Sequence, residues 1–274
     1  MNLTHWIPLL ALAALLPAPA RAAEIAVPFR TLVFAAAVPT SVDARYKRAQ
    51  ELARSGDTAA ALKEYLWCFD EGMLGVSSYT GVRRSYVLSE IAKLGEKNPD
   101  ALAALRERRD AAEKRLLASR DNFDAAADFA SINRYLKEDA RTLQLYDKLA
   151  PNDTRRRSLG LTVYDLLAEA RRYQDALQVQ PYDRMSSRFD LSIQKYPVPA
   201  DVPNPEQKRK EWRNYVAETT ARDIEVLAGS GDLAHAKKLT KRLLAYDGSE
   251  ETKAVLQQSL TRAGHPDLLA VPAK

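Results

Sequence analysis

Cysteine and histidine are almost absent from this sequence, which has one cysteine, Cys68, and three histidines among its 274 residues. A single cysteine cannot form an internal disulfide, so the fold must be held together by its apolar core. The few candidate ligands show none of the spacings typical of zinc sites, and no glycine-rich phosphate loop or dinucleotide fingerprint is present. We therefore expect no metal and no cofactor, and we interpret Cys68 as a buried packing residue.

Glycine is also scarce, with 10 residues, and no segment shows alternating strand-like runs between tight glycine turns. Both absences argue against an all-β fold. Alanine, leucine, arginine and glutamate are abundant instead, and their side chains lose little conformational freedom in a helix. The composition therefore predicts an all-α protein.

Long apolar runs are missing as well. The run at residues 7–16 is too short for a helix that spans a bilayer, which needs about 20 residues. Ala20-Arg21-Ala22 follows it as a small-x-small cleavage site, so we interpret residues 1–22 as a signal peptide cleaved after Ala22. The mature protein is then expected in the periplasm or secreted, without an integral membrane segment. An uncleaved anchor is the alternative, because no Lys or Arg precedes the apolar run.

Charge of one sign does not dominate, because the formal net charge is only +5 and the charges are spread along the chain. Exported proteins seldom meet nucleic acid, so we expect no nucleic-acid partner. Pro99 begins a long helical pattern whose second face, residues 106–114, is dense in both charges and is expected to be solvated. Residues 81–94 predict another helix, with Tyr86 on its apolar face.

Residues 46–69 hold the pattern that the rest of the chain repeats. Two amphipathic helical segments meet there at a turn centred on Gly56, and small residues such as Ala61 stand where the helices would cross. Residues 52–57 are matched by residues 227–232, and Ala61 is matched by Ala236. Two weaker copies lie between them, at offsets of 81 residues (Ala130, Leu143 and Tyr146 for Ala49, Leu62 and Tyr65) and 115 residues (Ala176-Leu177 for Ala61-Leu62).

These copies resemble tetratricopeptide repeats. The first copy supplies the small, turn and aromatic positions of that pattern as Ala49, Gly56-Asp57, Ala61, Tyr65 and Cys68. The third copy supplies Ala168, Tyr173 and Ala176, and the last supplies Gly231-Asp232, Leu233 and Ala236. The resemblance implies a right-handed superhelix of helical hairpins. The family's helix A tryptophan is absent from every copy and the intervals are uneven, so the array is expected to be irregular.

A concave groove lined by the first helix of each hairpin is the site that the resemblance implies. Exposed positions of these helices would contact a protein or peptide partner. Carried over by position, they are Tyr46, Gln50 and Arg54 in the first copy, Asp165 and Glu169 in the third, and Glu225 in the last.

Proline marks the boundaries of the expected domains. Five prolines fall within residues 181–205, which read as an insertion or linker with a short helical middle. The expected organisation is a signal peptide (1–22), an N-terminal arm (23–40), helical hairpins (41–180), the insertion (181–205), a C-terminal hairpin with a capping helix (206–263) and a tail (264–274).

The function expected from these features is that of a non-enzymatic interaction scaffold of the cell envelope. One alternative is an enzyme or enzyme subunit with residues 181–205 as a lid; Ser192 and Lys195 match a Ser-x-x-Lys nucleophile pattern, but its companion motifs are missing. A second alternative is a module that binds an anionic polymer or membrane through basic faces, such as residues 155–157 and 208–210. The run at residues 155–157 opens a helix, where the dipole disfavours cations, which is consistent with an acidic contact; a solvated turn is the interpretation we favour.

Overall fold

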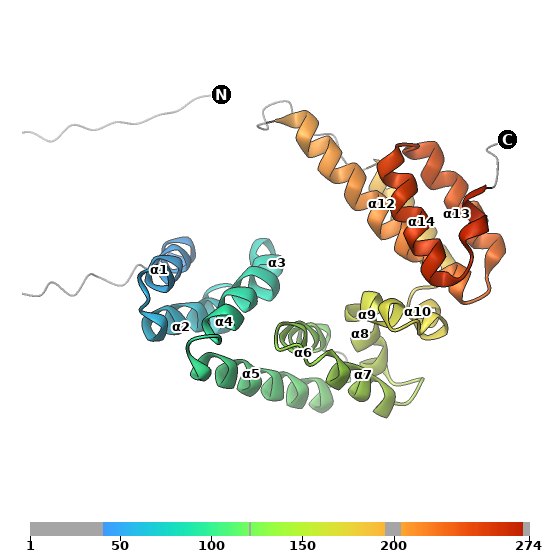
Figure 1. Ribbon diagram of the computed structural model, residues 1–274. Helices are drawn as coiled ribbons and strands as arrows, with labels where there is room; N and C mark the ends of the chain where they lie inside the picture. Colours follow the sequence, from blue (N-terminus) through green and yellow to red (C-terminus); the bar gives the residue numbers. More distant parts are fainter. Residues whose placement is uncertain (1–40, 121, 195–203, 271–274) are drawn as a thin grey trace, which may run out of the picture. The chain divides into compact units, whose positions relative to one another are not determined.

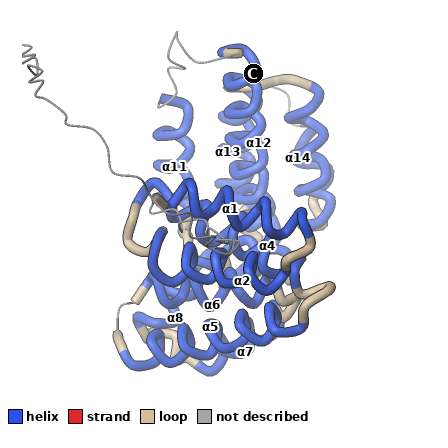
Figure 2. The backbone as a smooth tube through the Cα atoms, turned by 90° about the vertical axis from the view of Figure 1, so that its left-hand side faces the viewer, coloured by secondary structure: helices blue, strands red, loops and turns tan. Residues whose placement is uncertain are grey.

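The computed structural model describes residues 41–120, 122–194 and 204–270. The signal peptide and arm expected at residues 1–40 lie outside this part, as do residues 195–203 of the insertion and the end of the tail. Every regular element in the described part is a helix, and none is a strand (Figure 2). The all-α prediction is confirmed for these residues.

Short helical elements followed by the long helix α5 make up the first half of the described chain (Figure 1). They are α1 (Val42–Ser55), α2 (Thr58–Trp67), the π-helical turn η1 (Cys68–Gly72), the 3-10 turn η2 (Ser77–Tyr79), α3 (Thr80–Val82), the π-helical turn η3 (Arg83–Val87), α4 (Leu88–Leu94) and α5 (Pro99–Ala118). Side chains cap the starts of α1 and α5: Ser41 accepts a hydrogen bond from the Ala44 amide at 3.2 Å, and Asn98 accepts one from the Asp100 amide at 3.1 Å.

The second half continues in the same manner and ends in a group of longer helices. Its elements are α6 (Phe123–Tyr135), α7 (Asp139–Lys148), α8 (Thr154–Thr162), α9 (Tyr164–Glu169), α10 (Tyr173–Val179), α11 (Tyr182–Gln194), α12 (Pro205–Gly229), α13 (Leu233–Tyr246), α14 (Glu250–Ala263) and the 3-10 turn η4 (Pro266–Ala270). Helix α12 packs against both α13 and α14 (Figure 1).

The matched turns of the first and last copies have the same backbone geometry. Gly56 and Gly231 both adopt the left-handed conformation, with φ of 89° and 87°. The next residue closes each turn: the Asp57 amide donates to the Leu52 carbonyl at 3.0 Å, and the Asp232 amide donates to the Leu227 carbonyl at 2.9 Å. This is the Schellman arrangement, which satisfies the last carbonyls of a helix.

The weaker copies form the same turn without glycine. Lys137 and Arg171 occupy the place of Gly56 at the two predicted offsets and have φ of 59° and 56°. The amide of Glu138 donates to the Asn133 carbonyl at 2.8 Å, and Arg172 makes the matching bond to Leu167 at 2.8 Å. The same turn geometry also ends α14, at Gly264. The local periodicity predicted from the sequence is therefore confirmed at the level of the turns.

Small residues stand at the helix crossings, as the pattern predicts. Ala61, Ala176 and Ala236 are fully buried at equivalent positions of the second helix of their hairpins. In the second copy this place is taken by Thr142, whose hydroxyl accepts a hydrogen bond from Asn133 at 2.9 Å. In the second copy, this buried polar pair stands at the two positions that are a leucine and an alanine in the other copies.

Two apolar clusters form the core of the described chain, and α5 and α6 contribute to both. Ala101 and Leu105 of α5 belong to the cluster built on α1, α2 and α4. Ala112 and Leu116 of the same helix belong to the cluster that continues to α14. Cys68 is fully buried in the first cluster, as expected, and burial raises the pKa of its thiol to about 11.

One expectation about a helix face needs correction, and two helix boundaries are now defined. Tyr86 is exposed rather than inward, because the π-helical turn η3 inserts an extra residue and rotates the face. The helix that opens with residues 155–157 is α8, which ends at Thr162, where the Thr162 hydroxyl bonds back to the Leu159 carbonyl at 2.7 Å, and α9 begins after Val163. The helical middle expected in the proline-rich insertion is present as α11, which packs against α12 and α13.

Candidate functional site

Two of the predicted groove residues of the first copy line one cavity. Gln50 and Arg54 of α1 face a space of about 480 Å³ whose opposite wall includes Lys93 and Lys97, from α4 and the turn that follows it. We call this space the α1/α4 groove. Tyr46 does not line it; its ring packs edge-on against the Tyr65 ring at 5.9 Å.

The α1/α4 groove carries more positive than negative charge at its surface. Lys93 pairs with Glu90 at 2.7 Å, and Glu96 lies on the same wall. In the described part of the chain, neither Arg54 nor Lys97 makes an ion pair. Both cations are exposed and are therefore available to a partner.

The other three predicted groove residues converge on one arginine, Arg222. Asp165 and Glu169 of α9 lie 3.8 Å and 3.3 Å from its guanidinium, and Glu225 lies at 3.4 Å. Glu225, expected at an exposed position, is instead fully buried and accepts a 2.7 Å bond from Arg262. These acids therefore join α9, α12 and α14, and only Asp165 and Glu169 also present charge to solvent.

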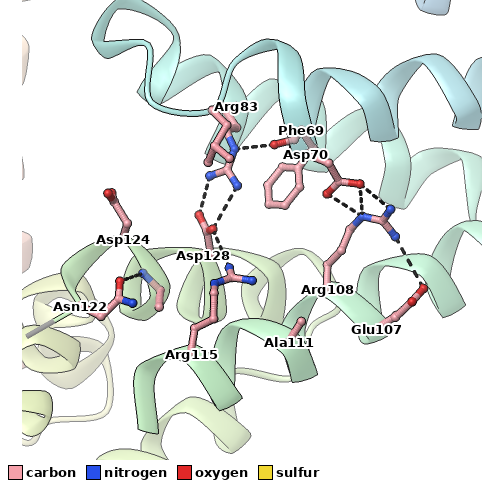
Figure 3. Close-up of a pocket in the computed structure, with 12 residues that line it drawn as sticks. Phe69, Asp70, Arg83, Glu107, Arg108, Ala111, Arg115, Asn122, Asp124 and Asp128 are labelled. Carbon is pink, nitrogen blue, oxygen red and sulfur yellow. Dashed lines mark hydrogen bonds and ion pairs between the residues drawn. The ribbon is translucent and has the colours of Figure 1, made fainter. Parts of the chain in front are cut away.

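A second cavity lies where no site was expected. It has a volume of about 390 Å³ and lies between η1, η3, α5 and α6 (Figure 3). We call it the arginine–aspartate cavity. It is lined by Phe69, Asp70, Leu74, Arg83, Glu107, Arg108, Ala111, Arg115, Asn122, Asp124, Ala125 and Asp128.

The buried carboxylate of Asp128 is the centre of this cavity. Arg83 donates to both of its oxygens, at 2.6 Å and 3.0 Å, and Arg84 donates at 2.9 Å. Arg115 approaches the same carboxylate from α5 at 3.3 Å (Figure 3). Three guanidinium groups therefore share one carboxylate, and charge-assisted bonds of this kind are the strong ones in proteins.

The remaining charged groups of the cavity are paired in a similar way. Arg83 also donates to the Phe69 carbonyl at 2.7 Å and lies 3.9 Å above the Phe69 ring. Arg108 forks onto Asp70, with its shortest bond at 2.5 Å (Figure 3). The charged face of α5 is thus partly buried, and the expectation that it is fully solvated is wrong.

Both π-helical turns of the described chain deliver side chains to this cavity. η1 supplies Phe69 and Asp70, and η3 supplies Arg83. Such turns are rare and often occur at functional sites. One sequence signal could have indicated this cavity. Asp128 is flanked by apolar residues within α6, and a charged residue in such a position indicates a buried polar contact.

A third polar cluster is buried between α9, α11 and α12. Asp223 accepts a bond from the Tyr164 hydroxyl at 2.8 Å and one from Arg188 at 2.5 Å. Burial raises the pKa of Asp223 and holds the pKa of Tyr164 well above its usual value. Arg188 also borders a cavity of about 530 Å³ with Leu191 and Trp212 on its walls.

The two basic runs are largely engaged within the chain. Arg155 binds Asp153 at 2.7 Å and Arg156 binds Asp175 at 3.2 Å, so these two residues make acidic contacts and the solvated turn that we favoured is wrong for them. Arg209 pairs with Glu206 one helical turn away, and Lys208 pairs in the same way. Intramolecular pairing of this kind reduces the charge that the basic faces offer to an anionic surface.

Across residues 41–120, 122–194 and 204–270, no helix is long and apolar enough to cross a membrane. The same ranges hold no group of three or more His, Cys, Asp or Glu side chains suited to a metal ion. Comparison with protein-family models, with curated proteins and with solved structures found no match for this chain. The described residues form an all-α fold in which several pairs of successive helices share one turn geometry.

Proposed function

We propose that this protein is a non-enzymatic interaction module that binds a segment of another protein in the α1/α4 groove. One observation carries the proposal: Gln50 and Arg54, selected by their position in the repeat pattern, line an open cavity of about 480 Å³. Cavities of this size suit peptide side chains, and Arg54 and Lys97 offer charged contacts on opposite walls.

The proposal extends to the architecture and the location of the protein. We infer a tetratricopeptide-like, right-handed array, since the four helix-to-helix turns at Gly56, Lys137, Arg171 and Gly231 share one geometry. The signal-like residues 1–22 support a role in the cell envelope.

Site-specific photo-crosslinking tests this function. A photo-reactive amino acid replaces Gln50 or Arg54 in the full chain, and replaces Arg157, an exposed residue outside the groove, as the control. We expect one protein to be crosslinked from positions 50 and 54 but not from 157, and to be identified by mass spectrometry.

Binding of the identified partner is then measured with purified proteins. Arg54→Glu reverses a charge in the groove and is expected to weaken binding by about tenfold or more, while Arg157→Glu leaves it unchanged. Equal crosslinking from all three positions, or equal affinities of the two variants, would contradict the proposal.

A further inference from the structure

We propose that the cavity between α11 and α12 is a second binding site, which takes an uncharged sugar ring of an oligosaccharide. We call it the α11/α12 cavity; its volume is about 530 Å³, and it shares no lining residue with the α1/α4 groove. Three features lead to this ligand: an aromatic wall, an arginine that is held in place from the protein interior, and side chains whose charges cancel.

An aromatic surface forms the α12 side of the cavity. The Trp212 indole lines the cavity, and its N–H donates to the Ser192 carbonyl of α11 at 3.0 Å, which fixes the ring. Tyr215 lies one helical turn further on; its ring centroid is 5.1 Å from that of Trp212, and the residue is 49% exposed. Leu191, on the α11 side, is 51% exposed. Large apolar side chains gathered at the surface beside a cavity are typical of a binding site.

Arg188 is held at the cavity by groups from the protein interior. Its guanidinium donates to the buried Asp223 carboxylate at 2.5 Å and lies 5.8 Å from the centre of the Tyr164 ring. The side chain is nevertheless 38% exposed and lines the cavity. A buried ion pair of this kind adds little net stability, so the property that a ligand would use is the fixed orientation of the Arg188 donors. Among the described residues, the Nε–H of Arg188 has no hydrogen-bond partner and remains available as a donor.

The charges at the cavity cancel, which favours an uncharged ligand. Asp223 balances Arg188, and Asp183 stands next to Arg184 at the start of α11. In the described part of the chain, the side chains of Asp183 and Arg184 make no ion pair, so the first offers hydrogen-bond acceptors and the second offers donors. Ser187, one helical turn further on, offers both.

A sugar ring has the matching chemistry. Its C–H groups form an apolar face that can lie against an aromatic ring, and its hydroxyl groups both donate and accept hydrogen bonds. Neighbouring hydroxyls can accept from Arg184 or Arg188 and donate to Asp183, so the polar groups of the cavity keep partners when water leaves. A purely apolar ligand would remove these groups from water without replacing their hydrogen bonds, which costs free energy. A charged ligand would find no excess of the opposite charge.

Nuclear magnetic resonance titration of the full chain tests the inference. The probes are cellobiose and N,N′-diacetylchitobiose, which are uncharged disaccharides. The readout is the indole N–H resonance of Trp212, and the indole of Trp67, which packs on the other apolar cluster, is the internal control. We expect the better disaccharide to shift the Trp212 resonance with a Kd of about 1 mM and to leave that of Trp67 unchanged. Equal shifts of the two indoles, or no shift of Trp212 with either disaccharide, would overturn the proposal.

Two further compounds test the class of ligand. Sorbitol carries hydroxyl groups without a ring, and the capped peptide acetyl-Leu-Ser-Leu-amide carries apolar groups and amides without a sugar. Both are expected to bind at least about tenfold more weakly than the better disaccharide. Sorbitol binding as tightly as the disaccharide would exclude the ring contact, and the peptide binding as tightly would make the cavity a peptide site; either result would overturn the assignment.

Variants of the polar side chains separate binding from structure. Asp183→Ala and Arg184→Ala each remove hydrogen bonds to the sugar and are expected to weaken the disaccharide about fivefold. Glu251→Ala and Lys241→Ala are the matched controls, since both residues are exposed and lie outside the cavity. Unchanged affinity in the two cavity variants, or an equal loss in the controls, would contradict the site.

Substitutions of Trp212 provide a test that a structural role would not meet. Trp212→Phe keeps an aromatic ring and Trp212→Leu keeps only an apolar side chain, while both lose the bond to the Ser192 carbonyl. We expect Trp212→Phe to bind the disaccharide within about threefold of the wild type and Trp212→Leu to bind about tenfold more weakly, as followed at the backbone amide of Leu191. Equal affinities of these two variants would exclude stacking on the ring and overturn the sugar assignment. None of these readouts depends on the α1/α4 groove.

Discussion

At the scale of single residues, the same turn is made both by residues that favour it and by residues that do not. Gly56 adopts φ of 89° without cost, because glycine has no Cβ to clash with the backbone. Lys137 adopts φ of 59° at the equivalent place, and its side chain is exposed. For a residue with a Cβ, this conformation costs about 1 kcal/mol or more. The hydrogen bonds of the turn and the packing of both helices hold Lys137 there.

Lys137→Gly is therefore expected to stabilise the protein, and Gly56→Ala to destabilise it, each by about 1 kcal/mol. A Cβ on Gly56 would meet no other atom within 4 Å, so its cost is one of backbone conformation alone. Urea unfolding followed by circular dichroism gives both values. Arg134→Gly, in the last turn of the helix before Lys137, is the control and should destabilise, as glycine does inside a helix. A loss of stability in Lys137→Gly would show that its side chain contributes more than its conformation costs.

At the scale of the elements, helix pairs pack closely because a small residue lies at each crossing. Ala61 and Ala236 are fully buried at the equivalent crossings of the first and last copies. The sequence made these positions predictable because a small residue followed each turn at a fixed distance. The Asn133–Thr142 pair was not predictable in this way, because a hydrogen bond there takes over the role of apolar packing.

Ala61→Leu and Ala236→Leu are each expected to lower the free energy of unfolding by about 1–3 kcal/mol, because the added atoms overpack a buried crossing. Ala59→Leu and Ala234→Leu are the matched controls, since both alanines lie on the same helices but are exposed. Thermal melts of the four variants compare the effects. Similar melting temperatures for a buried variant and its control would show that the crossings are not where the repeat pattern places them.

The elements that carry the arginine–aspartate cavity were much harder to foresee. A regular helix over residues 81–94 would put Tyr86 on the inner face, as its spacing indicates. The π-helical turn η3 shifts the register so that Arg83 is buried and Tyr86 is exposed. Such a turn depends on tertiary contacts, here between Arg83 and Asp128, which lie 45 positions apart. Local periodicity does not contain that information.

At the scale of the whole molecule, the sequence predicted the class of fold and the local turns better than the site. Helix composition and turn glycines are local features, and they were sufficient for the all-α assignment and for the shared turns. The groove residues were predicted by position alone: Gln50 and Arg54 line a cavity, whereas Glu225 is buried in an ion pair. Burial of a charged residue depends on its distant partner, in this case Arg262, and was not visible in the spacing.

Buried charge also couples the stability of the whole molecule to pH through Asp223, which joins α9, α11 and α12. Because burial raises its pKa above 3.8, the folded state binds the proton more tightly than the unfolded state does. Its contribution to stability is therefore largest below the unfolded pKa and is lost as the pH rises through the folded pKa. Asp223→Asn should remove this dependence, so the free energy of unfolding of the wild type, minus that of the variant, should fall as the pH rises above about 4.

The opposite sign is expected for Asp247, which makes it the control. Burial opposes ionisation there too, but hydrogen bonds from Thr252 and Ser249 outweigh it and lower the pKa of Asp247. Its contribution is present above the unfolded pKa and is lost as the pH falls through the folded pKa, so the difference between wild type and Asp247→Asn should shrink on acidification. Urea unfolding of the three proteins between about pH 3 and pH 7 measures both slopes. Slopes of the same sign would mean that the bond from Arg188 outweighs the burial of Asp223.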